Sequence, residues 1–343
     1  MSRFHPFILI DLPYRVINNQ SLEATILIPN NLYDRSRHKE KRPVMVRFHG
    51  GGFILGQRNY EPWFSRWCLD LAYANGAIIV SPDYRLLPES NGADILSDID
   101  HFWQWIQRDL VDIAEERRWG VIPDLSRVLC CGESSGGCLA VYSALGLSSI
   151  LCRDSMSRVN ARGKEAKPIT IKAVISISSP LDPNVPELRI PRPRKFMGTK
   201  APPPRQAEGL IRNYIKNMRP GSIRTGQNPT LDMWELLLCI LQQCYLPRLI
   251  KGNGDKDMFG LLMGLLKKEE KSADAGIPTW VIHGTEDTLI PHICSTKFAE
   301  RLRELAPVRL DLQPGDHMFE VDMSIDEKWI AEGRESFLER YWP

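Results

Sequence analysis

Two hydrophobic patterns alternate along the chain. Short runs of consecutive apolar residues end at glycine, serine or proline, which is typical of strands buried on both faces of a sheet. Between them, apolar residues recur every three or four positions, which is typical of helices with one buried face. The predicted strands are 21–28, 44–48, 77–80, 128–131, 169–178, 279–283 and 308–312, and predicted helices are 93–116 and a segment that begins at 138. The pattern predicts an α/β fold with a mostly parallel central sheet and helices on both faces.

The region 180–275 breaks this alternation. It begins with a stretch rich in proline and arginine, shows no clear strand, and continues with helical segments such as 232–246. Trp234, Leu237 and Leu241 recur at helical spacing, and exposing such side chains would be costly. We therefore predict a helical cap or lid inserted into a core formed by 1–179 and 276–343. The alternative is an insertion that lies solvated on the surface.

Composition and charge narrow the classes of partner. The 343 residues include 44 Lys and Arg against 42 Asp and Glu, a net charge of +2 that argues against nucleic acid as the main partner. No apolar run reaches the 18 or so residues of a membrane-spanning helix, so no stable membrane insertion is expected. The N-terminal apolar run is too short for a secretory signal. The eight cysteines lie mostly inside apolar segments, which predicts a reduced, cytoplasmic protein.

The sequence GESSGG follows the predicted strand 128–131 and precedes a predicted helix. Residues 132–136 match the G-x-S-x-G pattern of a nucleophile elbow, in which a sharp turn between strand and helix lifts a serine above the sheet. Ser134 is the predicted nucleophile, and the backbone amide of Ser135 would point at the group that Ser134 attacks. The alternative is an ordinary glycine–serine turn.

A serine hydroxyl needs a base, and in this arrangement the base comes last in the chain. Three histidines follow Ser134. His317 lies in a loop just after the predicted strand 308–312, and it is our candidate. His283 ends its own strand and is expected to be buried and structural, whereas His292 follows a proline at a predicted helix start and is expected at the surface.

The base needs a carboxylate to orient it. Asp287 lies just past the predicted strand 279–283, on the same edge of the sheet as the other two groups, and is the predicted acid. Glu286 would face elsewhere in the turn, Asp316 is too close to His317 along the chain to orient its ring, and Asp311 lies within a strand. The alternative for Asp287 is a carboxylate that only stabilises a helix N-terminus.

Three consecutive glycines, Gly50, Gly51 and Gly52, follow His49 directly after the predicted strand 44–48. Glycines let backbone N–H groups approach a ligand closely, as an oxyanion hole requires. Gly51 and Gly52 are predicted to join Ser135 as the donors. His49 is expected to brace this loop through hydrogen bonds, with Gly50 supporting it. The alternative is a simple flexible loop.

Five motifs occur in order between about residues 44 and 320: HGGGF, DYRLLPE, GESSGG, GTEDTLIP and GDHMF. Together they resemble the hormone-sensitive-lipase family of α/β-hydrolases. The resemblance implies a serine carboxylic-ester hydrolase that needs no cofactor, with Ser134, Asp287 and His317 as its triad. It also implies that DYRLLPE packs near the oxyanion loop. No CxxC or HExxH pattern is present, so no metal is expected either.

Two departures from the family pattern bear on the substrate. The family commonly shows GDSAGG where this chain has GESSGG, and it often builds part of its cap from a long N-terminal helical region that is short or absent here. Trp234, Leu238 and Tyr245 are predicted to line the substrate pocket from the cap.

Three functions are compatible with these residues. The leading one is hydrolysis of a small-molecule ester with a small to medium acyl group. The second keeps the triad but passes the acyl group to another acceptor, closes a lactone or releases the acyl group from a thioester. This reaction would belong to secondary metabolism, where similar proteins occur in fungi and plants. The third is a ligand receptor, because the plant gibberellin receptor resembles this family but has lost the catalytic histidine. A strand at 308–312 at the sheet edge would allow a homodimer.

Overall fold

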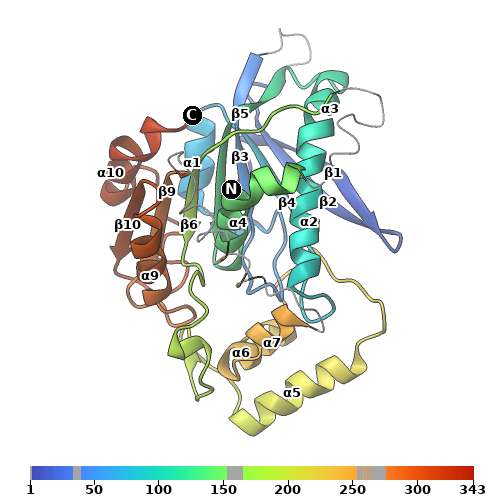
Figure 1. The fold of residues 1–343 in the computed structure, drawn as a ribbon, viewed down its shortest axis with the longest axis vertical. Coiled ribbons are helices and arrows are strands. Elements are labelled where there is room, and N and C mark those ends of the chain that lie inside the picture. The colour runs from blue at the N-terminus through green and yellow to red at the C-terminus, as the bar shows by residue number, and fades with distance from the viewer. Residues whose placement is uncertain are drawn as a thin grey trace.

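An eight-stranded sheet forms the centre of the molecule (Figure 1). The computed structural model describes residues 2–33, 40–152, 165–252 and 276–343, together with 258, 260 and 264. The strand order is β1-β2-β4-β3-β5-β6-β9-β10, in which β2 is antiparallel to both β1 and β4 and every other neighbouring pair is parallel. The strands are β1 Phe7–Ile17, β2 Gln20–Pro29, β3 Glu40–Phe48, β4 Ile78–Pro82, β5 Val121–Glu133, β6 Ile171–Ile177, β9 Thr279–Gly284 and β10 Val308–Gln313. The mostly parallel α/β sheet that the hydrophobic pattern predicts is confirmed.

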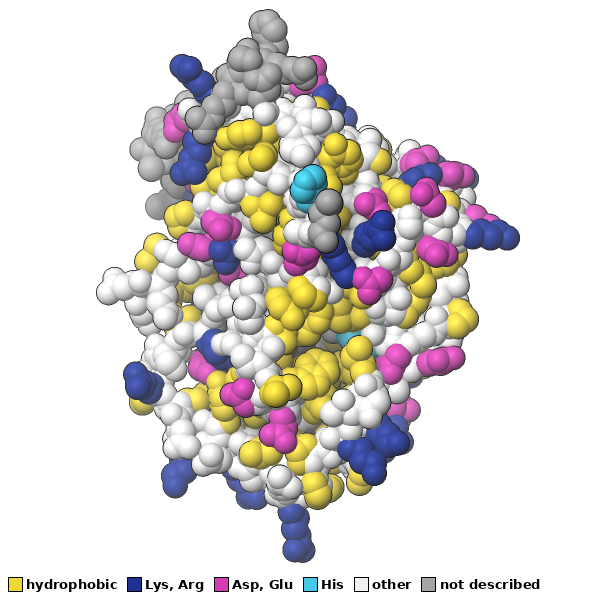
Figure 2. Space-filling model, turned by 180° about the vertical axis from the view of Figure 1, so that it is seen from behind, with side chains coloured by type: hydrophobic (Ala, Val, Ile, Leu, Met, Phe, Trp, Pro, Cys, Tyr) yellow, Lys and Arg dark blue, Asp and Glu magenta, His cyan; other side chains and the backbone are white. Residues whose placement is uncertain are grey.

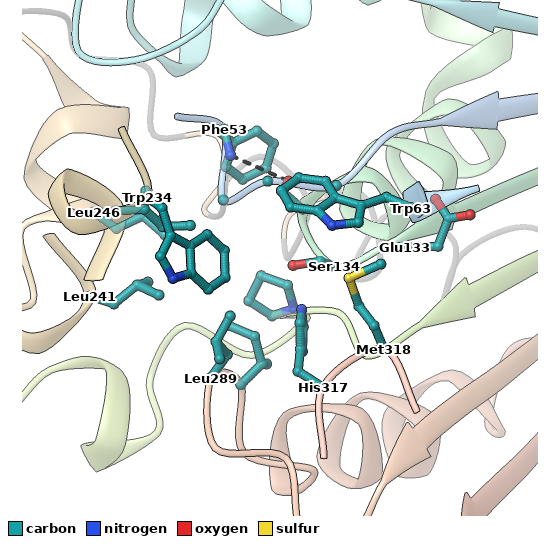
Figure 3. A pocket seen from close by; sticks show the side chains of 17 residues that line it. Phe53, Trp63, Glu133, Ser134, Trp234, Leu241, Leu246, Leu289, His317 and Met318 are labelled. Carbon is teal, nitrogen blue, oxygen red and sulfur yellow. Dashed lines mark hydrogen bonds between the residues drawn. The ribbon is translucent and has the colours of Figure 1, made fainter. Parts of the chain in front are cut away.

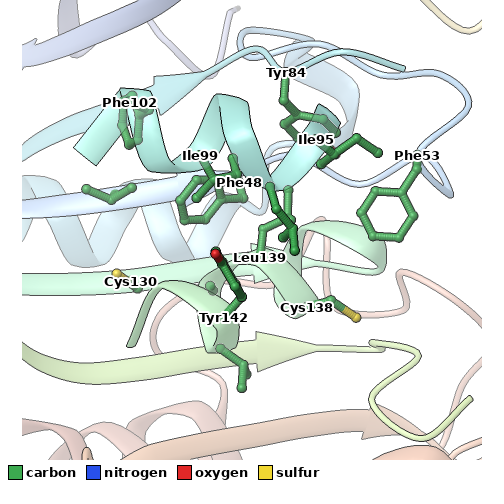
Figure 4. Close-up of a cluster of buried hydrophobic side chains, with 14 of the residues drawn as sticks. Phe48, Phe53, Tyr84, Ile95, Ile99, Phe102, Cys130, Cys138, Leu139 and Tyr142 are labelled. Carbon is green, nitrogen blue, oxygen red and sulfur yellow. The ribbon is translucent and has the colours of Figure 1, made fainter. Parts of the chain in front are cut away.

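The strands separate two hydrophobic cores, because alternate side chains of a strand point to opposite faces. In β4, Ile78 and Val80 pack into one core and Ile79 into the other. Helices α2 Gly92–Trp105, α4 Ser135–Cys152 and α9 Ile293–Leu302 cover the first face, and Figure 4 shows part of that core. Helices α1 Arg66–Ala74 and α10 Lys328–Ser336 cover the second. Both faces of the central strands are therefore covered by helices.

The predicted helix 93–116 consists of three consecutive pieces. Helix α2 begins at the capping residue Asn91, whose side chain accepts a hydrogen bond from the Asp94 amide at 3.1 Å. It continues through a five-residue π-helical turn, Ile106–Leu110, into α3 Val111–Glu116. The buried face that the spacing predicts runs through all three pieces.

The region 180–275 contains α5 Pro204–Asn217, α6 Leu231–Gln242 and α7 Leu246–Lys251, which lie together at the lower end of Figure 1. It also contains two strands of two residues each, β7 Lys195–Phe196 and β8 Thr199–Lys200, paired antiparallel. Strands this short carry no periodic pattern, so the expectation of a region without strands was wrong. Most of 253–275 lies outside the described residues. This part includes most of the charged stretch 267–278, KKEEKSADAGIP, with which the predicted cap ends.

Several further predictions concern surfaces and compartments. Among the described residues, no helix is long and apolar enough to cross a membrane. Seven cysteines, at 68, 130, 131, 138, 239, 244 and 294, are free thiols. Acidic and basic side chains are interspersed over much of the face shown in Figure 2. Strand β10 is an edge strand of the sheet and pairs with β9. The homodimer and the cytoplasmic location remain predictions.

Candidate active site

Ser134 lies in the tight turn between β5 and α4. Its φ of +52° is in the left-handed region that residues with a side chain rarely adopt. The turn is held because the Ser134 N–H donates to the Ile177 carbonyl at 2.7 Å and the Gly137 N–H donates to the Ser134 carbonyl at 3.1 Å. A Cβ atom on Gly132 would lie 2.3 Å from the Gly136 carbonyl oxygen, so the turn requires glycine there. The strained backbone is what a nucleophile elbow needs.

The His317 ring is bound to Asp287. Nδ1 of His317 lies 2.7 Å from Oδ2 of Asp287, and both side chains are almost fully buried. The other Asp287 oxygen, Oδ1, accepts hydrogen bonds from the backbone N–H groups of Leu289 and Ile290, at 2.9 and 2.8 Å. These bonds fix the carboxylate. Because Nδ1 is engaged, the second ring nitrogen of His317 is the one left to exchange protons.

The pair also shifts the acidity of both groups. Burial alone would raise the pKa of Asp287, but the His317 charge and a hydrogen bond from His283 together hold that pKa well below its usual range. Burial alone would lower the pKa of His317, yet the charge and hydrogen bond of Asp287 outweigh it and raise that pKa above its usual value. Asp287 is therefore ionised at neutral pH, and His317 is a stronger base than a free imidazole.

His283 also contacts Asp287, at 3.1 Å between Nε2 and Oδ2. It is fully buried, and its Nε2 lies 2.9 Å from the Ile290 carbonyl while its Nδ1 lies 2.6 Å from the Ser295 hydroxyl. Since a carbonyl only accepts, Nε2 carries the hydrogen and Nδ1 accepts from the serine. Both ring nitrogens face protein groups, as expected for a structural histidine.

The other candidate carboxylates lie elsewhere. Glu286 is exposed. Asp316 accepts hydrogen bonds from the backbone N–H groups of Thr288 and His317, both at 2.7 Å, and so ties the loop after β9 to the loop after β10. Asp311 lies within β10 and accepts from the Trp280 indole at 2.6 Å. The structure brings only Asp287, among the acids considered, against the His317 ring.

The loop that follows β3 approaches Ser134 closely. Gly51 and Gly52 have φ values of +110° and +63°, and a Cβ atom on Gly51 would lie 2.0 Å from the Leu55 carbonyl oxygen. The Phe53 N–H donates to the Ser135 hydroxyl at 3.3 Å, which joins this loop to the elbow. Ser135 is the first residue of α4, where backbone N–H groups have no partner within the helix. The loop and the helix start thus surround the space above Ser134.

His49 is buried behind this loop. Its ring stacks on Tyr84 with 4.2 Å between centroids, and its Nδ1 lies 2.8 Å from the Gly50 carbonyl. The Tyr84 hydroxyl donates to the His49 carbonyl at 2.6 Å, and the Leu87 N–H donates to the Phe53 carbonyl at 2.8 Å. Burial lowers the pKa of His49 to about 3, so its ring is neutral. These contacts place the DYRLLPE segment against the glycine loop.

A largely apolar cavity opens at Ser134 (Figure 3). Trp234, Leu237 and Leu241 of α6 line it, at spacings of three and four residues that put them on one face of the helix. Leu238, predicted to line it, does not, because it lies one position further around α6. Tyr245 is also absent from the lining and faces a separate surface cavity with Arg248. The cavity is lined by Gly50, Gly51, Gly52, Phe53, Trp63, Glu133, Ser134, Ser135, Pro180, Trp234, Leu237, Leu241, Leu246, Leu289, Ile290, His317 and Met318.

Comparison with known proteins shows the family of the chain. A family model described as alpha/beta hydrolase fold matches residues 45–216. A probable carboxylesterase, M8 of Phoma sp., is 42% identical over 344 aligned residues, which cover 99% of this chain and 98% of the relative. The chain belongs to the hormone-sensitive-lipase family of α/β-hydrolases. With that identity along its whole length, it is a carboxylic-ester hydrolase.

Two further similarities extend the comparison. The solved structure of esterase B from Lactobacillus rhamnosis superposes with a TM-score of 0.58 at 18% identity, covering 98% of this chain and 85% of that one, and shows the common fold. A non-reducing polyketide synthase, Preu6 of Preussia isomera, is 26% identical over 333 residues, which cover 92% of this chain but 14% of the synthase.

Two lining residues of this hydrolase were not predicted. Trp63 reaches the cavity from the segment before α1, which lies outside the five motifs and in no periodic segment. Met318 reaches it from the loop after β10 and lies within GDHMF, so its position next to His317 was a usable signal. The position of Leu237 and Leu241 in the cavity could be predicted from the sequence, because both lie on the same face of the predicted helix as Trp234. Among the described residues, no three His, Cys, Asp or Glu side chains gather as metal ligands would.

Proposed function

We propose that Ser134, His317 and Asp287 form a catalytic triad that hydrolyses carboxylic esters with small to medium acyl groups. The observation that carries the proposal is the 2.7 Å contact between His317 and Asp287 beside a cavity that also contains Ser134 in a strained turn. Such a constellation activates a hydroxyl that is otherwise a weak nucleophile.

In the first half of the reaction, the Ser134 oxygen attacks the ester carbonyl carbon while Nε2 of His317 takes the hydroxyl proton. The carbonyl oxygen becomes an oxyanion, which the N–H groups of Gly51, Gly52 and Ser135 stabilise. The tetrahedral intermediate then collapses, His317 returns its proton to the alkoxide, and the alcohol leaves. Asp287 holds the imidazole in the required tautomer and stabilises its charged form.

In the second half, water replaces the alcohol. His317 takes a proton from the water, which attacks the acyl-enzyme carbonyl, and then returns the proton to the Ser134 oxygen as the carboxylic acid is released. The apolar lining from α6 suits an uncharged acyl group. We assign 180–275 the role of a cap that supplies this lining, and 1–179 and 276–343 that of the catalytic core.

The test is hydrolysis of p-nitrophenyl esters of increasing acyl length by the purified protein and by Ser134→Ala. We expect turnover by the wild type, strongest for small and medium chains, and none above background by the variant. Equal rates for the two proteins would refute the proposed nucleophile, and an inert wild type would refute the substrate class.

A second candidate uses the same triad to release acyl groups from thioesters. The specific observation in its favour is the similarity of almost the whole chain to a 14% segment of a polyketide synthase, since polyketide chains are assembled as thioesters. A direct comparison of an ester and an N-acetylcysteamine thioester with one acyl group separates the candidates. The second predicts the larger kcat/KM for the thioester, beyond the difference seen in uncatalysed hydrolysis.

A further inference from the structure

A second buried carboxyl group lies three residues beyond His317. Residues 316–323 form successive turns, in which the Phe319 N–H donates to the Asp316 carbonyl and the Val321 N–H to the Met318 carbonyl, both at 3.1 Å. The Val321 carbonyl in turn accepts from the first amide of α1 at 2.9 Å. The segment is thereby folded against α1, and the Glu320 side chain points inward with 0% exposure.

Only part of this carboxyl group has a partner. The Ser65 hydroxyl donates to Oε1 of Glu320 at 2.7 Å, whereas Oε2 has no hydrogen-bond partner within the described part of the chain. Ser65 is the residue immediately before α1, and negative charge is favoured at the start of a helix by the helix dipole. A buried acid with one free oxygen is costly to keep ionised unless a positive charge comes near it.

The charged groups around Glu320 come from four elements. Glu133 at the end of β5 is paired with the buried Arg47 of β3, at 3.1 Å between Nε and Oε2. His317 and Asp316 lie on the same segment as Glu320, and the thiols of Cys68 in α1 and Cys131 in β5 lie on the remaining side. Arg47 is already engaged by Glu133. The protonated His317 ring is therefore the counter-charge that forms during the reaction.

We propose that Glu320 is a positioning residue of the active site that sets the basicity of His317, its carboxylate stabilising the imidazolium formed when His317 takes the Ser134 proton. The inference rests on the proposed triad. It differs from the role of Asp287, because Asp287 bonds the ring directly and Glu320 acts through its charge.

The acidities of both groups support this coupling. Burial raises the pKa of Glu320 to about 7; the Ser65 hydrogen bond and the His317 charge lower it, while Glu133 raises it. For His317, burial lowers the pKa, and Asp287, then Glu320 and Asp316, raise it. The charge of each group therefore shifts the pKa of the other, so the two titrations are coupled.

The test is the pH profile of kcat/KM for Glu320→Gln, with p-nitrophenyl acetate as the substrate. Glutamine keeps an acceptor for Ser65 and removes the charge, so His317 loses its proton more easily. The acid limb should move to lower pH, by on the order of one pH unit, with a lower plateau. Glu327→Gln, which changes an exposed glutamate in the same C-terminal region, should leave the profile unchanged.

A second variant keeps the Glu320 carboxyl group and removes the Ser65 hydroxyl, which bonds Glu320 and also interacts with Glu133. Ser65→Ala removes the donor to the charged form, so the pKa of Glu320 rises and the group stays neutral over a wider range. The acid limb should shift in the same direction as in Glu320→Gln but less, and the double variant should shift no further than Glu320→Gln alone.

The outcomes separate this role from a structural one. A lower rate or melting temperature in Glu320→Gln with an unmoved acid limb, or a limb moved to higher pH, would overturn the proposal. If Glu320→Gln fails to fold, an unmoved limb in Ser65→Ala overturns it equally. Labelling of Ser134 by a fluorophosphonate probe is measured in parallel, because its absence from the wild type would refute the triad and not the role of Glu320.

Discussion

The loops at the ends of β3, β5, β9 and β10 and helix α6 both line the cavity at Ser134, but different interactions hold them. The loops are fixed by the backbone: φ values near +50 to +110°, glycines without room for a Cβ atom, and carboxylates that accept several N–H groups. Helix α6 is held by packing, since most of its apolar side chains are buried among other apolar side chains.

Because the loops and α6 are held by different interactions, we assign the reaction to the loops and the choice of ester to α6. Backbone constraints place reacting groups within the narrow tolerances that acyl transfer needs. Packing is more permissive, because hydrophobic side chains of similar size can replace one another at moderate cost. We therefore expect substitutions in the loops to abolish the reaction and substitutions in α6 to change which ester is preferred.

The largest effect is expected at the nucleophile and the base. Ser134→Ala and His317→Ala should each lower kcat by on the order of 10⁶-fold, and the double variant should be little worse than either, because the two groups act as one unit. Steady-state kinetics with circular dichroism as the check of folding measures this. Strictly multiplicative losses would show that the two residues act independently.

Asp287→Asn is expected to have the second-largest effect, a loss of about 10⁴-fold in kcat, because the amide would favour the wrong tautomer of His317. Glu286→Gln and Asp316→Asn are the controls. The first changes an exposed side chain, and the second weakens a loop contact without touching the ring bond. A crippled Asp316→Asn beside an active Asp287→Asn would move the role of acid to Asp316.

The glycine loop should show an intermediate effect. In Gly51→Ala the new Cβ atom would lie 2.0 Å from the Leu55 carbonyl oxygen, so the loop must shift its N–H groups. Loss of one oxyanion donor costs about 10²–10³-fold in kcat, and we expect a fall in that range. Gly209→Ala in α5, where a Cβ atom meets open space, is the matched control and should keep full activity. Equal kcat for the two variants would exclude the loop from oxyanion binding.

The smallest and most selective effect is expected in α6, where two neighbouring leucines form a matched pair. Leu237 lines the cavity and Leu238 does not, although both are buried. Leu237→Ala should enlarge the acyl site and shift the ratio of kcat/KM between long and short esters by tens-fold. Leu238→Ala should destabilise the fold by about 2–5 kcal/mol and leave that ratio alone.

Activity toward an acetate ester serves as the internal reference for both leucine variants. This activity should survive in each variant, since the proposed oxyanion donors belong to the core loops. The same shift in preference from both variants would contradict the assignment of one α6 face to the cavity, and equal loss for every ester would make α6 purely structural.

Local sequence patterns predicted most of the sheet and the loops that carry the proposed triad, because both depend on neighbours in the chain. Each apolar run ends at a loop, and Ser134, Asp287 and His317 occupy loops at one edge of the sheet. Strand β1 escaped prediction: Asp11, Pro13 and Arg15 interrupt its apolar pattern, and it forms the half-exposed antiparallel edge of the sheet.

What could not be predicted depends on contacts between distant segments. Helical spacing alone did not say which face of α6 meets the cavity, so Leu238 was preferred to Leu237. The contact of Glu320 with Ser65 joins residues 255 positions apart. No local pattern encodes it, although it places a charge beside the proposed base.

The most direct measurement of the central claim is to label the protein with a fluorophosphonate and locate the adduct by peptide mass spectrometry. We predict one stoichiometric adduct, on Ser134, that is absent from Ser134→Ala and forms much more slowly in His317→Ala. An adduct on a different serine, or labelling of Ser134→Ala at the rate of the wild type, would contradict this prediction.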